Sequence, residues 1–306
     1  MRIAVTGATG LVGRAVAGKL VARGDEVVAL SRDPKDAASR LPSGVRAEPF
    51  ALDDPALVAK ALSGADAVVH LAGEPVMAHR WNRRVQAGIR NSRVEGTRTI
   101  VRAIEEAEPR PKVLVSASAT GYYGHRDDME IDEDAPAGHD FLAEVARSWE
   151  AEAERATALA VRAAILRIGI VLSRDGGALP RIAAPFRWFL GGPLGNGSQG
   201  FPWIHIEDLA ALVLFAIDRE AARGPLNAVA PEIVSNREFC RALGRVLHRP
   251  GFFPAPRLAL RIFVGRAAAV LLSGQRVIPR RTLESGFTFR FPRLDTALAD
   301  LFPKQG

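Results

Sequence analysis

The sequence predicts an α/β fold: a Rossmann-type, doubly wound parallel sheet with a smaller, mainly helical C-terminal lobe. Two observations support this prediction. The first 32 residues read as strand, glycine-rich turn, helix and strand, which is one βαβ unit. From there to residue 172, apolar runs of strand length alternate with segments of helical periodicity. This alternation is typical of a parallel sheet with helices on both faces.

The first βαβ unit is built around the sequence TGATGLVG at 6–13. We expect Gly7 to allow a tight turn, Gly10 to let the backbone approach a pyrophosphate, and Gly13 to let the helix pack closely on the sheet. The pyrophosphate would rest on the N–H groups and the positive dipole end of the helix. The same stretch supplies three further expected cofactor contacts, which are Thr9, Leu11 and Val12.

The second strand, over 26–30, ends in Ser31 and Arg32. A site that prefers NAD usually has an acidic residue there, which holds the ribose 2′-hydroxyl. Arg32 would instead attract a 2′-phosphate, and Ser31 could donate a hydrogen bond to it. We therefore expect NADP(H) as the cofactor. Two alternatives stay open: Arg32 could be a solvated loop charge, and Asp33 could take the ribose role one position later.

The middle of the chain repeats the alternation of strands and helices. Asp53-Asp54-Pro55 is a helix start signal, because Asp caps a first turn and Pro is tolerated early in a helix. The sequence then predicts, in chain order, a strand over 46–52, a helix over 56–62, a strand over 65–72, a helix over 92–107, a strand over 112–116, a helix over 141–157 and a strand over 164–172.

The composition changes after Ser173, where glycine pairs and an Asn-Gly turn indicate loops. Regular secondary structure is predicted again over 203–216, followed by a short strand over 226–229 and helical segments over 237–247, 257–272 and 296–301. We expect this lobe to close over the carboxyl edge of the sheet, where ligands bind. The predicted domains are an NADP-binding Rossmann domain made of 1–172 and 203–230, and a substrate-binding C-terminal lobe made of 173–202 and 231–306.

The composition also bears on the class of protein. No stretch approaches the ~18 apolar residues that a membrane span needs. The net charge of +7 could indicate a nucleic-acid-binding protein, but the arginines are scattered along the sequence. A positive net charge would equally serve to attract a polyanionic cofactor or substrate.

The cysteine and histidine content narrows the class further. Cys240 is the single cysteine and lies in an apolar helical pattern, so we expect a buried, inert thiol. The six histidines show no metal-ligand spacing, so no metal site is expected. The chain starts with a strand instead of a leader segment, which predicts a cytoplasmic protein.

Four stretches together resemble the extended short-chain dehydrogenase/reductase family: TGATGLVG at 6–13, HLAG at 70–73, SASATGYYG at 116–124 and LRIGIVL at 166–172. More narrowly, the chain is similar to the NAD(P)-dependent nucleoside-diphosphate-sugar epimerase subgroup, on the strength of a GEP…RW stretch over 73–81, GGPLGNG at 191–197, PWIHIEDLA at 202–210 and the C-terminal extension LLSGQRVIPRRTLESGFTFRFP at 271–292. The resemblance implies an oxidoreductase or epimerase that acts on a small polar substrate, sugar-like or carbonyl.

The resemblance also implies a catalytic Ser, Tyr and Lys. In such a site a tyrosinate takes the substrate hydroxyl proton, the lysine lowers the tyrosine pKa, and the serine bonds the substrate oxygen. Tyr and Lys stand four residues apart on one helix face. The serine maps onto Ser118, but Phe141 and Val145 occupy the Tyr and Lys positions. No lysine occurs between Lys112 and Lys304.

The only tyrosines, Tyr122 and Tyr123, follow Ser118 at the edge of the sheet where the nicotinamide is expected. One of them could be a displaced acid or base, with an arginine or histidine supplying positive charge. Either could also be a loop aromatic that shapes the pocket. Two functions therefore stay open. One is an NADP(H)-dependent enzyme with a non-standard site, and the other is a catalytically inactive NADP(H)-binding sensor or scaffold.

The remaining candidate residues follow from the resemblance. Arg93 could reach a cofactor phosphate or replace the charge of the missing lysine, or it could be an exposed helix arginine. Asp208 is expected to cap the helix that follows it. Further expected cofactor contacts are Leu71, Ala72, Gly73, Ser116 and Val171. Expected substrate contacts are Glu74, which is also an alternative acid or base, Arg80, Trp81 and His205. We expect a small-molecule substrate, a homodimer as one option, and no nucleic-acid or membrane partner.

Overall fold

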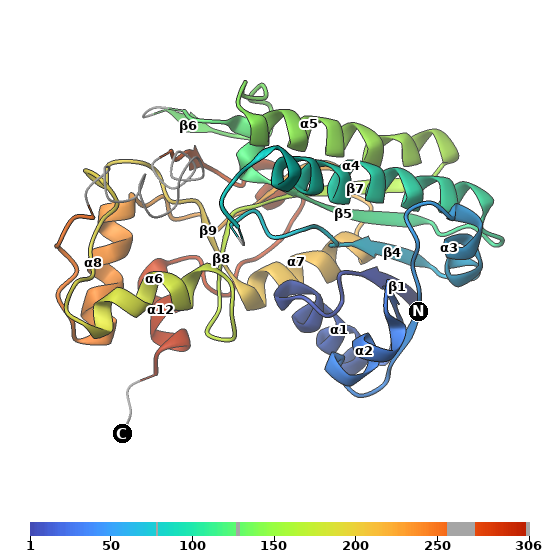
Figure 1. The fold of residues 1–306 in the computed structure, drawn as a ribbon, viewed down its shortest axis with the longest axis horizontal. Helices are drawn as coiled ribbons and strands as arrows, with labels where there is room; N and C mark the ends of the chain where they lie inside the picture. Colours follow the sequence, from blue (N-terminus) through green and yellow to red (C-terminus); the bar gives the residue numbers. More distant parts are fainter. Residues whose placement is uncertain (78, 127–128, 256–272, 304–306) are drawn as a thin grey trace.

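The computed structural model describes residues 1–77, 79–126, 129–255 and 273–303. At its centre lies a seven-stranded parallel sheet with the strand order β3-β2-β1-β4-β5-β7-β10 (Figure 1). The order reverses between β1 and β4, the point at which ligands bind in open α/β sheets. This confirms the predicted doubly wound sheet. Its strands are β1 Arg2–Thr6, β2 Glu26–Ser31, β3 Val45–Pro49, β4 Ala67–His70, β5 Val113–Ala119, β7 Arg162–Ile168 and β10 Gly224–Ala228.

Helices cover both faces of the sheet, because successive strand residues point to opposite sides. Ile3 and Val5 of β1 belong to the core shared with α1 and α7, whereas Ala4 between them belongs to the core shared with α3 and α4. Asp54 caps α3 through the Leu57 N–H, as the helix start signal predicts. The helices of this domain are α1 Leu11–Arg23, α2 Pro34–Arg40, α3 Pro55–Leu62, α4 Arg83–Glu106, α5 Phe141–Glu154 and α7 Ile206–Asp218.

In the part of the chain that the structure describes, three helices of the second lobe pack around their own apolar core (Figure 1). Phe186, Trp203 and Phe239 are buried there. Cys240 is also buried, which confirms the predicted buried thiol, and burial raises its pKa to about 12. None of the described helices is long and apolar enough to cross a membrane. The elements of this lobe are α6 Ala178–Arg187, the parallel pair β8 Ile170–Leu172 and β9 Trp203–His205, α8 Asn236–Leu247 and α12 Leu294–Leu301.

Several boundaries differ from the sequence predictions. The strand predicted over 164–172 breaks at Gly169, where a Cβ would lie 2.6 Å from the Pro202 oxygen. Helix α4 begins nine residues before the predicted start, because Asn82 caps it through the Val85 N–H. Helix α6 lies in a stretch whose glycines predicted loops. The helix predicted over 257–272 lies outside the described residues.

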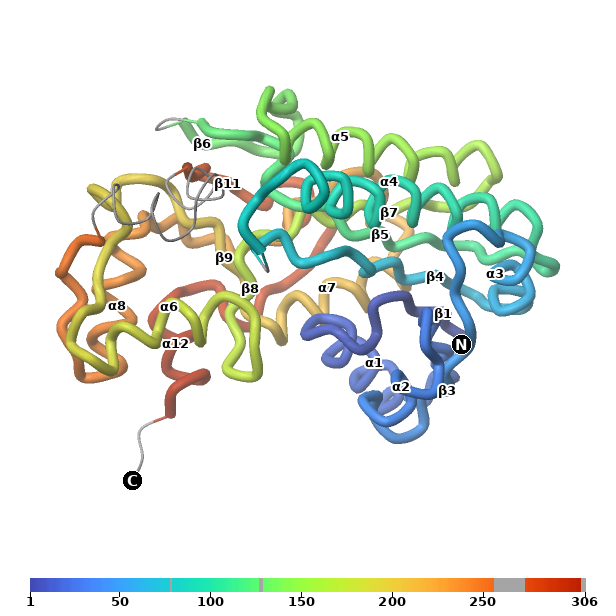
Figure 2. Tube along the Cα trace, in the orientation of Figure 1, coloured from blue at the N-terminus to red at the C-terminus, as the bar shows by residue number. Residues whose placement is uncertain are grey.

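The C-terminal extension returns to the Rossmann domain before it ends in α12. Strand β11 Arg276–Val277 pairs in parallel with β6 Glu130–Ile131, and the short helix α11 Arg280–Glu284 follows. Phe287 and Phe289 then enter the core beside α7. Figure 2 shows this stretch, in red, running from the second lobe to the sheet and back. The predicted division therefore differs from the observed packing, since part of 231–306 lies on the Rossmann domain.

Candidate functional site

The glycine-rich turn joins β1 to α1 at the carboxyl edge of the sheet. Gly7 has a φ of 68°, and a Cβ on it would lie 2.8 Å from the carbonyl carbon of Leu71. A Cβ on Gly13 would lie 2.1 Å from the Gly7 oxygen, whereas a Cβ on Gly10 would have its nearest neighbour at 3.2 Å. Gly7 and Gly13 are therefore needed for the packing of the turn itself. A Cβ on Gly10 would be tight only against the Gly7 oxygen, so the other sides of this position are clear of described residues.

The first turn of α1 presents backbone N–H groups to this open side. Gly10 is the N-cap residue, and no side chain from the described residues caps the helix. The turn itself is held by the Gly10 N–H, which donates to the Gly7 oxygen at 3.0 Å, and by Arg14, which donates to the Thr9 oxygen at 2.8 Å. Unpaired N–H groups and the positive end of the helix dipole bind phosphate. These residues fit the pyrophosphate of a dinucleotide.

The end of β2 leaves Arg32 available to an anion. Asp33 is the N-cap of α2, and its carboxylate accepts the Asp36 N–H at 3.0 Å. The Ser31 hydroxyl donates to the Asp33 oxygen at 3.1 Å and accepts the Asp33 N–H at 3.2 Å. Arg32 is exposed, and no other described residue pairs with it. This geometry disfavours the alternative in which Asp33 holds the ribose, because the carboxylate is already engaged at the helix start.

The loop after β8 lies against the start of α1. A Cβ on Gly177 would be 2.9 Å from Leu11 Cδ2 and 3.9 Å from the Val171 oxygen. Val171 is half-buried and pairs with Ile204 of β9. The fold therefore brings Leu11 and Val171, two predicted cofactor contacts that are far apart in sequence, into one neighbourhood.

The end of β4 is tied to the end of β1. Thr6 Oγ1 and His70 Nδ1 are 2.7 Å apart, and the Ala72 N–H donates to the Thr6 hydroxyl at 3.3 Å. Because Leu71 also approaches Gly7 closely, the segment 71–73 lies beside the glycine-rich turn. This is where the adenosine side of a dinucleotide is expected, so these residues remain predicted cofactor contacts.

Arg93 supports the loop after β4 from helix α4. Its Nη1 donates to the oxygens of Glu74 and Ile89, at 2.9 and 3.2 Å, and its guanidinium carbon lies 5.3 Å from the centre of the Trp149 ring. Burial lowers the pKa of Arg93, and the charge of Glu74 acts in the opposite direction. These contacts exclude the alternative of a freely exposed helix arginine.

The loop that carries the predicted substrate contacts reaches the start of α5. Trp81 Nε1 donates to the Val76 oxygen at 2.8 Å, and its ring meets the Phe141 ring edge to face at 5.4 Å. Phe141 is the first residue of α5, and Val145 is buried one turn later. The helix position of the family Tyr thus lies beside this loop, and both family positions carry apolar side chains. Glu74 and Arg80, on the same loop, are exposed.

Ser118 belongs to a buried polar cluster at the ends of β5 and β7. Its hydroxyl donates to Glu150 Oε1 at 2.6 Å, and Arg167 donates to both oxygens of the same carboxylate at 2.9 and 2.8 Å. Burial disfavours the Arg167 cation, but Glu150 outweighs this effect and the pKa of Arg167 lies above its usual value. The Ser118 hydroxyl is therefore engaged with a carboxylate. Ser116, two residues earlier, is also buried and donates to the Ala117 oxygen at 3.2 Å.

Tyr123 lies on the other side of Arg167. Its hydroxyl donates to Asn227 Oδ1 at 2.7 Å and accepts a hydrogen bond from Arg167 Nη1 at 2.9 Å. Burial raises the pKa of Tyr123 to about 12, although Arg167 and Asn227 favour the ionised form. Tyr123 thus carries its proton near neutral pH. This favours the predicted pocket-shaping role over an acid–base role.

Tyr122 differs from its neighbour in both burial and bonding. It is half-buried, and no described residue forms a hydrogen bond with its hydroxyl. The guanidinium carbon of Arg167 lies 3.6 Å from the centre of its ring, and the Tyr123 ring meets it edge to face at 5.4 Å. Cation–π contact fixes the ring on Arg167. Tyr122 is therefore the tyrosine whose hydroxyl could exchange a proton with a ligand.

The sequence predictions did not include four members of this cluster: Glu133, Glu150, Arg167 and Asn227. The Glu133 carboxylate accepts the N–H groups of Asn227 and Arg281 at 2.9 and 3.1 Å. A signal existed for two of them, because Arg167 interrupts an apolar strand and Glu150 lies on the buried side of α5. A buried charge needs a partner, so these two could have been paired.

His205 has a structural place at the start of α7. Its Nδ1 accepts the Glu207 N–H at 3.1 Å, its ring lies on the Phe291 ring at 4.0 Å, and the side chain is 1% exposed. The expected cap at Asp208 is wrong, because its carboxylate accepts the N–H groups of Arg290 and Phe291 at 2.7 and 2.9 Å instead. This geometry gives His205 the capping role and does not support its predicted contact with substrate.

Two family models match the chain. The model of the NAD dependent epimerase/dehydratase family matches residues 3–229, and that of a domain of unknown function (DUF1731) matches residues 255–301. The first match includes the glycine-rich turn and the whole polar cluster. The second includes the C-terminal extension that returns to the sheet.

Relatives and solved structures extend the comparison. The chain is 41% identical over 307 residues to the chloroplastic epimerase family protein SDR39U1 homolog of Arabidopsis thaliana, covering 97% of this chain and 86% of that relative. It is 41% identical over 306 residues to the epimerase family protein SDR39U1 of Bos taurus, covering 98% and 99%. The crystal structure of human epimerase family protein SDR39U1 (isoform 2) with NADPH matches with a TM-score of 0.87 and 37% identity over 100% of both chains.

The plant relative's name places that protein in the chloroplast, so a cytoplasmic location for this chain stays a prediction. The family match and the observed fold agree with the resemblance inferred from the four sequence stretches. The chain is a member of the NAD dependent epimerase/dehydratase family.

Proposed function

We propose that the protein is an NADP(H)-dependent oxidoreductase or epimerase that acts on a small polar substrate, sugar-like or carbonyl. One observation carries the choice of cofactor: uncapped N–H groups at the start of α1 lie on the same sheet edge as Arg32, an exposed cation without a partner among the described residues. A dinucleotide with an additional 2′-phosphate matches both features. The human relative crystallised with NADPH supports the same choice.

The residues that would hold NADP(H) are spread over three strand ends. The first turn of α1 would bind the pyrophosphate, Arg32 with Ser31 the 2′-phosphate, and the segment 71–73 the adenosine side. Val171 would lie toward the nicotinamide. The bound cofactor supplies or accepts a hydride.

For the proton, we propose Tyr122 as the group that exchanges it with the substrate. Its hydroxyl makes no hydrogen bond to a described residue, whereas those of Ser118 and Tyr123 are engaged with Glu150 and Asn227. Arg167 keeps a positive charge 3.6 Å from the centre of the Tyr122 ring. This charge would take the place of the family lysine.

A catalytically inactive NADP(H)-binding sensor or scaffold is the second candidate. The observation that favours it is the apolar pair Phe141 and Val145, at the helix positions where the family has its acid–base residues. A protein that lost its catalytic activity but kept its cofactor site would lack the Tyr and Lys in this way.

The cofactor assignment is tested by titrating the protein with NADPH and NADH. We expect Arg32→Ala to weaken NADPH binding by about tenfold to a hundredfold, the effect of one charge-assisted contact, and to leave NADH binding nearly unchanged. Arg40→Ala, an exposed arginine of α2, is the matched control and should change neither. Equal losses for both nucleotides would reject the 2′-phosphate role.

Turnover separates the enzyme from the sensor. NADPH oxidation is followed against a panel of carbonyl substrates, and sugar substrates are analysed for epimerised product, because an epimerase returns the hydride and oxidises no cofactor overall. Tyr122→Phe should abolish whichever activity is found while NADPH binding and folding stability are retained. Saturable NADPH binding without turnover of any substrate, and without any effect of Tyr122→Phe, would favour the sensor.

A further inference from the structure

Two neighbouring loops at the far end of the second lobe expose an unusual amount of apolar surface. Of the nine large apolar side chains that are exposed in the described part of the chain, five lie there. We call these five residues the aromatic patch: they are Trp188 (78% exposed), Phe189 (56%), Leu190 (68%), Phe252 (65%) and Phe253 (47%). A cluster of this kind on a folded domain marks a surface that meets a partner.

The two loops are held together, so the five side chains form one surface. The Phe253 N–H donates to the Gly191 oxygen at 3.2 Å, and a Cβ on Gly192 would lie 2.1 Å from the Phe253 oxygen. The rings of Phe252 and Phe253 are 4.7 Å apart. Phe189 has a φ of 62°, which a non-glycine residue rarely adopts. The backbone thus accepts an unfavourable conformation where it presents these side chains.

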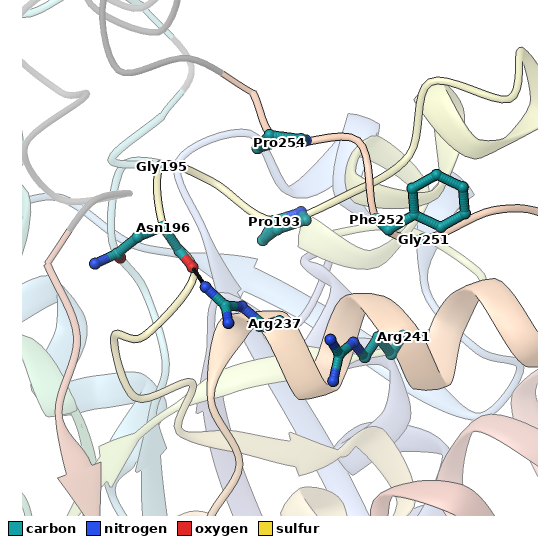
Figure 3. Close-up of a pocket in the computed structure, with 8 residues that line it drawn as sticks. All are labelled: Pro193, Gly195, Asn196, Arg237, Arg241, Gly251, Phe252 and Pro254. Carbon is teal, nitrogen blue, oxygen red and sulfur yellow. Dashed lines mark hydrogen bonds between the residues drawn. The ribbon is translucent and has the colours of Figure 1, made fainter.

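Positive charge surrounds the aromatic patch. Arg187 precedes it, and the Arg249 guanidinium carbon lies 4.7 Å from the centre of the Phe189 ring. Arg237 and Arg241 stand on successive turns of α8 beneath the loop that carries Pro193 (Figure 3). A cavity of about 300 Å³ opens between them, with Phe252 in its wall, and one of about 650 Å³ adjoins it. Neither cavity has an acidic residue in its lining.

The excess positive charge of the sequence lies in two stretches, which include the two loops of the aromatic patch. The stretches 176–206 and 239–283 contain eleven arginines and no Asp or Glu. Because the chain has 41 basic and 34 acidic residues, the rest of it has 30 basic against 34 acidic residues. Arg245, which lines the second cavity, pairs with Asp295 at 3.1 Å. The net charge of +7 therefore comes from the stretches that build the second lobe and the C-terminal extension.

We propose that the aromatic patch binds the surface of an anionic phospholipid bilayer. Trp and Phe side chains partition into the headgroup region, and arginines beside them pair with lipid phosphates. The arginine-lined cavities next to Phe252 are suited to phosphate headgroups. Binding to a membrane surface requires no membrane-spanning helix. The proposal therefore departs from the sequence-based expectation of no membrane partner, but it does not need a longer apolar segment.

The test uses the full chain and sucrose-loaded vesicles of phosphatidylcholine alone or with about one third phosphatidylserine. We expect the protein to bind the anionic vesicles at least about tenfold more tightly than the neutral ones, because each arginine at the surface contributes about 1 kcal/mol to binding. Tryptophan fluorescence should shift to the blue on binding. Trp149 and Trp203 are already buried and Trp81 is half-buried, so the shift reports mainly on Trp188.

Two pairs of double variants distinguish binding through the aromatic patch from nonspecific binding to vesicles. Trp188→Ser with Leu190→Ser should abolish binding, whereas Leu52→Ser with Leu283→Ser, which removes exposed apolar side chains elsewhere, should not. Arg187→Glu with Arg241→Glu should weaken binding at least about thirtyfold, from the loss of two surface arginines. Arg102→Glu with Arg219→Glu makes the same change in net charge outside the patch and should have a much smaller effect. Thermal unfolding confirms that each variant is folded.

Equal binding of both vesicle types, or unchanged binding of the Trp188 and Leu190 variant, would overturn the proposal. Sedimentation velocity tests the competing occupant, a second copy of this chain. A dimer that dissociates on replacement of Trp188 and Leu190, with no binding to vesicles, would assign the patch to self-association and would equally overturn it. Neither result bears on the cofactor site, which is tested separately.

Discussion

The three glycines of the turn meet different steric demands, and the structure separates them. A Cβ on Gly13 would lie within 2.1 Å of a backbone oxygen, so any side chain there displaces the turn. Gly10 has a φ of −73°, which every residue type can adopt, and its nearest neighbour would be 3.2 Å away. The steric cost of a side chain is therefore much greater at Gly13 than at Gly10, and at Gly10 we expect the main effect to be on ligand binding.

We predict that Gly10→Val folds but loses NADPH binding, because the side chain fills the space of the pyrophosphate. Gly13→Val should instead be strongly destabilised through overpacking against the turn. Urea unfolding and NADPH titration of both variants check this. If Gly10→Val kept its affinity, the turn would not contact the pyrophosphate.

The two adjacent tyrosines also differ at the residue scale. We predict that Tyr123→Phe lowers the free energy of unfolding by about 1–3 kcal/mol, because buried partners on Asn227 and Arg167 lose a hydrogen bond. Tyr122→Phe should change it by no more than about 0.5 kcal/mol, since its hydroxyl bonds no described residue. The measurement is urea unfolding of the two variants side by side. A larger loss for Tyr122→Phe would contradict the assignment of roles.

Among the elements, those defined by local signals matched their predictions best. The predicted bounds of the βαβ unit and of α3 agree with the structure to within a residue or two. This is because a turn or a helix cap is determined by residues that lie close together in the sequence. The strand predicted over 164–172 was not, because contact with Pro202 breaks it at Gly169. Strands β6 and β11 were missed altogether, since each has two residues and exists only through its pairing with the other.

The C-terminal extension is joined to α7 through Asp208, which is 1% exposed and accepts two backbone N–H groups. We predict that Asp208→Ala lowers the free energy of unfolding by about 2–4 kcal/mol, because both donors lose their partner inside the protein. Glu207→Ala removes only a part-exposed ion pair with Lys19 and should cost less than about 1 kcal/mol. Urea unfolding measures both. Equal losses would show that Asp208 does not fasten the extension.

At the scale of the whole molecule, stability should depend on pH through a histidine in the core. His70 is fully buried between the sheet and α4, and burial lowers its pKa to about 4. Its Nε2 has no hydrogen-bond partner among the described residues. Between pH 6.5 and about 4 the unfolded chain therefore binds a proton at His70 that the folded chain does not.

Stability should fall as the pH is lowered through this window, by about 3 kcal/mol from His70 alone. We predict that His70→Asn removes this part of the pH dependence, whereas replacement of the exposed His248 by Asn leaves it. Urea unfolding of the three proteins from pH 7.5 to pH 4 gives the comparison. Identical pH profiles for wild type and His70→Asn would refute the prediction.

The sequence by itself determined the features that depend on neighbours along the chain: the βαβ unit, the glycine-rich turn, the cation at the end of the second strand, and the absence of the Tyr and Lys pair from its helix. Only the tertiary structure decided how the polar residues combine. The Tyr123 hydroxyl reaches Asn227 across 104 residues of sequence, and Ser118 reaches Glu150 across 32. Such contacts are set by the order of strands in the sheet, which no local pattern records, and they decide which hydroxyls stay open to a ligand.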